Sequence, residues 1–126
     1  MSKRNKIIYW VATLWLSLGM ISTGIVQLMK LPKETDFITK MGYPEFLLPF
    51  LGITKFLGVI AVLIPRYPLV KEWAYAGFFF MMSGAIYSHV VTGAPIGEVA
   101  PPVLLLVLTV ISWRFRPAER KIAELN

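Results

Sequence analysis

Two ionisable side chains, Lys55 and His89, lie inside stretches of sequence that are otherwise apolar. Lys55 is the ninth of the eighteen residues from Leu47 to Ile64, which puts it ~13 Å from the nearer end of a helix built from them. An ammonium group at the centre of a membrane costs about 2.5–3.5 kcal/mol, and no Asp or Glu lies in any of the apolar stretches to neutralise it. Either Lys55 faces a neighbouring helix and donates to backbone carbonyls, or it belongs to a polar pocket or relay.

His89 lies near the end of the third apolar stretch, and an imidazole titrates near neutral pH, so it is suited to carry a proton. If the second and third stretches are antiparallel helices, Lys55 and His89 differ in depth by ~8 Å, most of which a lysine side chain can span. The other polar residues expected in this half of the membrane are Gln27, Thr23, Ser88 and Glu98. Each alone is explained as the polar end of a helix. With Lys55 and His89 they predict one ligand-binding cavity that opens toward the outer leaflet.

The composition excludes an ordinary soluble domain. Of the 126 residues, 56% are hydrophobic and 16% charged, and the mean hydropathy is +0.65, whereas a soluble domain carries about 25% charged residues. Zero cysteines exclude disulfides, thiolate metal sites and cysteine redox centres. With a single histidine, no metal site built by the protein is expected.

The hydropathy pattern predicts an all-α integral membrane protein, a four-helix bundle forming a single domain over residues 1–126. The spans are expected at about 7–29, 46–64, 73–92 and 99–115. The first is interpreted as a retained helix, because its uncharged run of 23 residues is too long for a cleaved signal peptide. Pro101 and Pro102 predict an irregular beginning of the last span.

The polar connection from residue 30 to 45 is expected to contain a short helix of its own. Phe37, Ile38 and Met41 recur there at helical spacing, which is typical of an amphipathic helix that lies at the membrane interface. Within the spans, Gly19 with Thr23 and Gly84 with Ser88 form small-x-x-x-small spacings. Such spacings predict close approach of neighbouring helices.

Basic residues predict the orientation. With four spans, both termini and the middle loop share one side, which holds 9 Lys and Arg residues against 3 on the other. The positive-inside rule then places both termini in the cytoplasm, with Lys71 and Glu72 as anchors in the middle loop. The net charge of +6 therefore reflects topology and attraction to lipid headgroups rather than nucleic-acid binding. Six aromatic residues are expected at the same interface: Tyr9, Trp10, Tyr67, Trp73, Tyr75 and Trp113.

Five short motifs follow one another along the chain: Gly42-Tyr43-Pro44, Gly52-x-x-Lys55-x-x-Gly58, Pro65 ending the second span, Lys71-Glu72-Trp73-Ala74-Tyr75-Ala76-Gly77, and Ser88-His89 followed by Gly93. In this order and spacing they resemble the DoxX-like family of small bacterial membrane proteins, over residues 7 to about 117. The resemblance implies a four-helix bundle in the bacterial cytoplasmic (inner) membrane. The family takes its name from a subunit of a thiosulfate:quinone oxidoreductase, and some relatives accompany oxidative-stress or quinone-detoxification proteins. Positions of the family pattern are matched by Lys55, Lys71, Glu72, Ser88 and His89.

Three functions fit these observations. The first is a non-enzymatic membrane protein whose pocket binds a small lipophilic molecule such as a quinone, or which supports a redox protein partner; Lys55 and His89 would donate to a carbonyl oxygen. The second is a subunit of a quinone-linked oxidoreductase, in which His89 carries a proton. The third is a transporter or channel protomer, which would need a homo-oligomer, although no inverted repeat relates the two halves. Apart from a quinone, no cofactor is expected.

Overall fold

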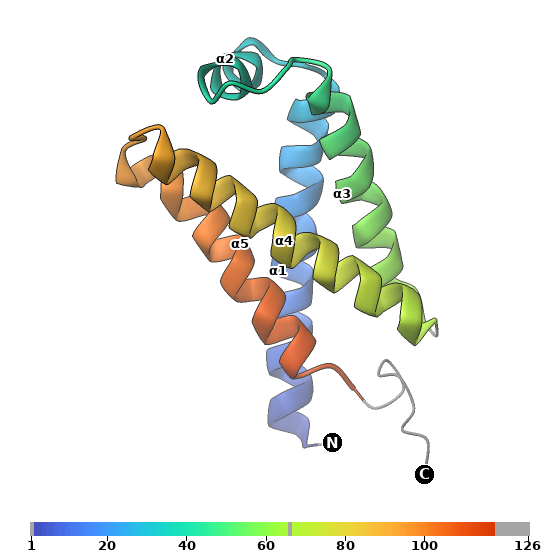
Figure 1. Cartoon of the computed structure of the whole chain (residues 1–126). Helices are drawn as coiled ribbons and strands as arrows, with labels where there is room; N and C mark the ends of the chain where they lie inside the picture. The colour runs from blue at the N-terminus through green and yellow to red at the C-terminus, as the bar shows by residue number, and fades with distance from the viewer. Residues whose placement is uncertain (1, 66, 118–126) are drawn as a thin grey trace.

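The structure, a computed structural model, describes residues 2–65 and 67–117. Every regular element in those residues is a helix, so the predicted all-α class is confirmed. Four of the helices are long and one, α2, is short, and Figure 1 shows α2 at the end of the bundle opposite the N-terminus. This end is called the α2 end below, and the other the N-terminal end. The helices are α1 Lys3–Leu28, α2 Pro32–Lys40, α3 Leu47–Leu63, α4 Pro68–Val91 and α5 Ile96–Arg114.

The four long helices form a bundle in which α1 and α4 are diagonal. Each of these two packs against both α3 and α5, while α1 and α4 do not approach each other closely. All four contribute to one apolar core, which consists of Ala12, Leu16, Met20, Val59, Val62, Tyr75, Phe78, Met82, Leu105 and Leu108. The core therefore holds the four helices in a fixed rotation about their axes, which decides which polar side chains meet.

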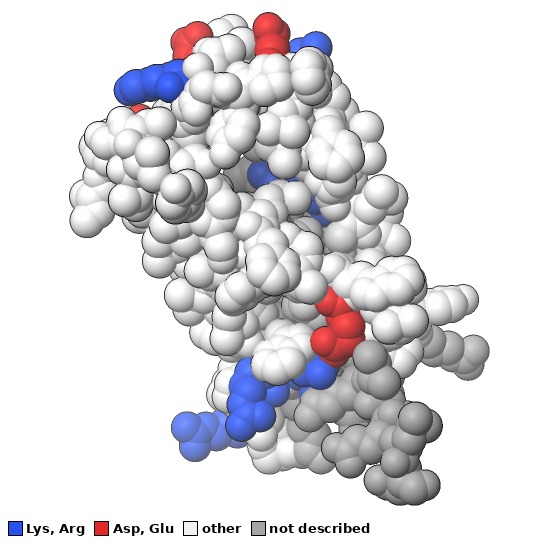
Figure 2. Space-filling view, viewed as in Figure 1, with Lys and Arg blue, Asp and Glu red and all other residues white. Residues whose placement is uncertain are grey.

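The helices have the length and composition of a multi-pass membrane protein. By these two criteria α1, α4 and α5 can each cross a membrane, whereas α3 is apolar but has 17 residues, which span about 25 Å of a hydrocarbon core that is about 30 Å thick. Large apolar side chains are exposed around the bundle, an arrangement suited to lipid and not to water. On the face shown in Figure 2, most charged side chains gather toward the two ends. The predicted cytoplasmic location of both termini stays a prediction.

The predicted short helix in the first connection is confirmed as α2. Pro32 occupies its first turn, where a missing N–H costs little. Gly42 follows its end with a φ of 88°, a left-handed conformation that glycine adopts without a steric penalty. α2 buries Ile38, contacts α1 and α3, and lies at the end of the bundle opposite the N-terminus (Figure 1).

Two expectations about helix beginnings are wrong. α5 begins at Ile96 and runs unbroken through Pro101 and Pro102, because the backbone acceptors freed by prolines near a helix start can be satisfied locally in a membrane helix. α4 begins at Pro68, earlier than the expected residue 73, so Lys71 and Glu72 lie in its first turns and not in a loop. Hydropathy marks where apolar residues begin, whereas a proline at the first helical position marks where the helix begins.

Glycines set the closest approach between α1 and its neighbours. A Cβ at Gly52 would lie 2.8 Å from the carbonyl oxygen of Gly24, and a Cβ at Gly19 would lie 2.7 Å from the Leu105 side chain. Close approach at Gly19 is therefore confirmed. At Gly84 it is wrong, because a Cβ there would meet nothing within 4 Å.

Candidate functional site

Lys55 extends from α3 toward α1. The residue is 5% exposed, and its Nζ donates a hydrogen bond to Thr23 Oγ1 at 3.2 Å. Thr23 in turn donates to the carbonyl of Gly19 at 3.0 Å, so its hydroxyl accepts from Lys55 and remains satisfied by its own helix. Two of the six residues predicted to form the site are therefore in direct contact.

Hydrogen-bonding groups near this contact have no partner among the described residues. The bond to Thr23 is the one hydrogen bond that the Lys55 amine makes within residues 2–65 and 67–117, although an ammonium group has three donors. Gln27 lies one helical turn beyond Thr23, and its Oε1 is buried without a hydrogen-bond partner among the described residues. Lys55 of α3 thus has donors, and Gln27 of α1 an acceptor, that no described residue uses, and the two helices pack against each other.

The face between α3 and α4 is hollowed beneath α2. In Figure 1, α3 and α4 approach each other near the turn that joins them and separate toward the α2 end. Figure 2 shows a hollow in this face, with atoms of a basic side chain inside it. The hollow opens on the side of the bundle, where lipid would surround a membrane protein.

Ser88 and His89 contact the α2 region of the chain. The Ser88 hydroxyl is hydrogen-bonded to the Tyr43 hydroxyl at 2.7 Å, and the His89 ring meets the Phe37 ring edge-on with 6.3 Å between centroids. These two contacts attach α2 and the residues after it to α4. No hydrogen bond joins Lys55 to His89 within the described part of the chain, and a cavity shared by both stays a prediction.

Glu98 lies in the first turn of α5 and is partly buried. Within the described ranges its carboxylate makes no hydrogen bond or ion pair, so its place in the predicted cavity stays a prediction. Tyr43, in contrast, is a site residue that sequence analysis overlooked. The only signal was its position in the Gly42-Tyr43-Pro44 motif, which indicates a turn but not the partner of the tyrosine hydroxyl.

The position of Lys71 differs most from what the sequence predicted. It is fully buried, and its Nζ donates to the carbonyls of Ala61 at 2.8 Å, of Val62 at 3.3 Å and of Ile64. The last carbonyls of a helix lack partners within it, and the helix dipole favours a cation there. Lys71 thus caps α3 from the following helix, and the expected role as an exposed anchor is wrong. Donation to backbone carbonyls, one of the two alternatives for Lys55, is found at Lys71.

A buried hydroxyl cluster joins three helices near the N-terminal end. Ser112 Oγ lies 2.6 Å from Thr13 Oγ1 and 2.8 Å from the Tyr75 hydroxyl. Tyr75 and Tyr9 are buried, so neither ring projects from the bundle toward lipid, and their expected depth at the membrane interface stays a prediction. Each tyrosine ring is apolar enough for the core, and the hydrogen bonds of Tyr75 make burial of its hydroxyl tolerable.

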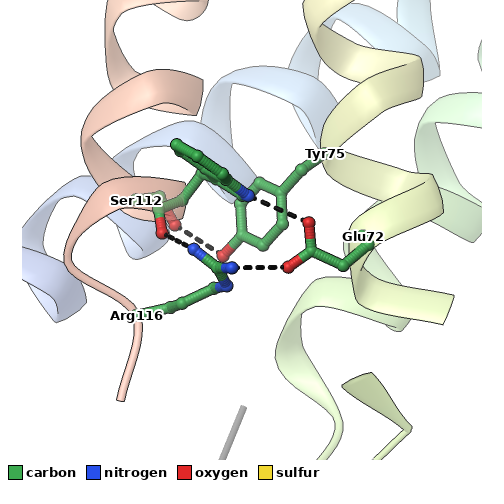
Figure 3. Close-up of polar contacts among 5 residues, drawn as sticks. Glu72, Tyr75, Ser112 and Arg116 are labelled. Atoms are coloured by element: carbon green, nitrogen blue, oxygen red, sulfur yellow. Dashed lines mark hydrogen bonds and ion pairs between the residues drawn. The ribbon is translucent and has the colours of Figure 1, made fainter. Parts of the chain in front are cut away.

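A charged cluster lies beside these hydroxyls (Figure 3). Glu72 of α4 accepts a hydrogen bond from Trp113 Nε1 at 2.9 Å and forms an ion pair with Arg116 at 2.8 Å. The Arg116 guanidinium lies over the Trp113 ring, 4.7 Å from its centroid. Glu72 therefore ties α4 to the residues at and after the end of α5.

Comparison with known families gives one match, to the DoxX-like family over residues 11–112. The chain belongs to the DoxX-like family. The match includes both buried lysines, Lys55 and Lys71, as well as Ser88 and His89. No curated protein and no solved structure matches the chain.

The two buried lysines of this DoxX-like protein differ in what their amines contact. Lys71 donates to three carbonyls at a helix end, which is sufficient reason for its burial. Lys55, in the middle of α3, makes its one hydrogen bond within the described residues to the hydroxyl of Thr23 on α1. The Lys55 amine can therefore donate to a ligand while it keeps its hydrogen bond to Thr23.

Proposed function

We propose that this DoxX-like membrane protein binds a small lipophilic molecule with a carbonyl group, of the quinone class, in the hollow beside Lys55. The observation that carries the proposal is the Lys55 amine, which is buried in an apolar helix and whose one hydrogen bond within residues 2–65 and 67–117 goes to Thr23. Polar groups inside a membrane are costly, and those that the fold does not need are usually retained for function.

The chemistry of the neighbouring groups favours a quinone over a hydrocarbon. The Lys55 ammonium has donors left for a carbonyl oxygen, and a charge-assisted hydrogen bond of this kind is stronger than a neutral one. The Gln27 oxygen, which is buried without a partner in the described residues, would accept from a hydroxyl of the reduced quinol. Lys55 would therefore bind the oxidised quinone through its carbonyl oxygen, and Gln27 would bind the reduced quinol through its hydroxyl.

The route to the site runs from lipid between α3 and α4. A lipophilic molecule reaches the hollow in Figure 2 from the side of the bundle and does not need to enter from water. α2 lies at the end of the bundle opposite the N-terminus, and the residues that follow it are attached to α4 through the hydrogen bond between Tyr43 and Ser88. The bound molecule would be accessible to a redox protein partner at the same side of the membrane.

Saturation binding of a short-tailed ubiquinone to the full chain in lipid nanodiscs tests the proposal. Lys55→Met keeps the length of the side chain and removes its donors, so it should raise Kd at least tenfold, which corresponds to about 1.4 kcal/mol. Lys33→Met, in exposed α2, is the control and should leave Kd unchanged. Unaltered binding by the Lys55→Met protein, or binding that never saturates, would rule the proposal out.

The second candidate, a subunit of a quinone-linked oxidoreductase, makes a different prediction for His89. With an electron-donating protein supplied, His89→Gln should slow quinone reduction while leaving quinone binding intact, because the imidazole would carry the proton. Binding without any reduction would favour the non-enzymatic function.

A further inference from the structure

A cavity lies between α4 and α5, toward the N-terminal end of the bundle, and Lys55 is not among the residues that line it. It measures about 370 Å³, and four aromatic residues, Tyr75, Phe79, Phe80 and Trp113, form much of its wall together with Glu72. Phe79, Phe80 and Trp113 are exposed on the outer surface of the bundle, so the cavity opens toward lipid. Its size and its aromatic wall suit a compact hydrophobic ligand.

Glu72 is the one charged residue among the described residues that line this cavity, and Arg116, its ion-pair partner, does not line it. One carboxylate oxygen accepts a hydrogen bond from Trp113 Nε1 at 2.9 Å, and the other pairs with Arg116 at 2.8 Å. The cation that neutralises Glu72 is therefore a side chain of the protein itself. A ligand that took the place of the guanidinium would meet the carboxylate, so the exchange favours a positively charged ligand over an anion.

Arg116 shows where a cation binds. Its guanidinium is 4.7 Å from the centroid of the Trp113 ring and pairs with Glu72 at 2.8 Å (Figure 3). An aromatic face with a carboxylate beside it is the arrangement that recognises organic cations, including quaternary ammonium groups. Arg116 lies two residues beyond the end of α5, and its guanidinium also donates to the carbonyl of Trp113, so a bound cation would displace it from both Glu72 and that carbonyl.

We propose that the cavity between α4 and α5 binds lipophilic organic cations, with Glu72 and Trp113 as the cation-recognising residues and Arg116 as an internal competitor for the same position. The hydrophobic groups of the ligand would pack against Phe79 and Phe80, and its charge would replace the guanidinium. This site is independent of Lys55 and of the quinone proposal.

The test uses two probe ions of nearly the same size and shape and of opposite charge, tetraphenylphosphonium and tetraphenylborate. Binding to the full chain is measured by isothermal titration calorimetry in neutral maltoside micelles, with protein-free micelles as the blank. Tetraphenylphosphonium should bind saturably and at least tenfold more tightly than tetraphenylborate. Equal binding of both ions, or no saturable binding of the cation, would overturn the proposal.

Variants of the two ion-pair partners should act in opposite directions. Glu72→Gln should weaken phosphonium binding at least tenfold, while Arg116→Gln should tighten it about threefold or more, because the competitor is gone. Asp36→Asn, which removes an exposed acid on α2, is the matched control and should have no effect. If Arg116→Gln weakens binding as much as Glu72→Gln, the pair is structural and the proposal fails. If the Glu72→Gln protein does not fold, the proposal is still tested by the phosphonium affinity of the Arg116→Gln protein and by the comparison of phosphonium with borate binding.

Discussion

Replacing Lys71 by methionine should destabilise the protein severely, although hydropathy alone would suggest the opposite. The substitution removes the donor to the carbonyls of Ala61, Val62 and Ile64 while keeping the length of the side chain. Hydrogen bonds to charged groups in soluble proteins contribute about 1.5–3 kcal/mol each, whereas side-chain hydrogen bonds measured in a membrane protein average about 0.6 kcal/mol. Counting three bonds between these limits, we expect a loss of about 3 kcal/mol, or about a hundredfold in the unfolding equilibrium.

The measurement is reversible unfolding of the purified chain in mixed micelles, followed by circular dichroism as the fraction of denaturing detergent rises. Lys55→Met is the matched control, because it makes the same substitution at the other buried lysine. Among the described residues Lys55 donates to Thr23 alone, and the Thr23 hydroxyl also donates to Gly19, so this variant should unfold within about 0.5 kcal/mol of the wild type or be more stable. Equal stability of Lys71→Met and the wild type, or equal losses for both variants, would refute the capping role of Lys71.

Three further predictions concern packing, polar satisfaction and topology. Gly52→Ala should cost about 1–3 kcal/mol, because the new Cβ would lie 2.8 Å from a backbone oxygen, whereas Gly77→Ala, with nothing within 4 Å, should not destabilise in the same unfolding assay. Ser112→Ala should lower the thermal midpoint, since it leaves two buried hydroxyls without their shared partner, at a cost of about 1–3 kcal/mol; an unchanged midpoint would show that the cluster contributes nothing. In intact cells, cysteine at Lys33 should react with an impermeant thiol reagent and cysteine at Lys3 should not, and the reverse pattern would invert the predicted topology.

Local sequence features predicted most of the secondary structure. A run of apolar residues long enough for the hydrocarbon core indicates a membrane helix whatever it packs against, and α1, α4 and α5 follow this rule. The helix α2 could be predicted because amphipathic spacing, Pro32 and Gly42 are all properties of neighbouring residues. Helix beginnings were less certain, since prolines at 68, 101 and 102 are compatible with more than one local geometry.

The partners of the polar side chains were decided by the tertiary structure alone. In lipid, the outward face of a helix is as apolar as its packed face, so hydrophobic periodicity does not reveal how each helix is rotated about its axis. That rotation turns Lys71 onto the end of α3 and brings Ser112 to Thr13, 99 residues away in the chain. The sequence determined that two lysines lie in or beside apolar helices. Only the packing of those helices decided that Lys71 caps α3, and that the Lys55 amine makes one hydrogen bond, to Thr23, among the described residues.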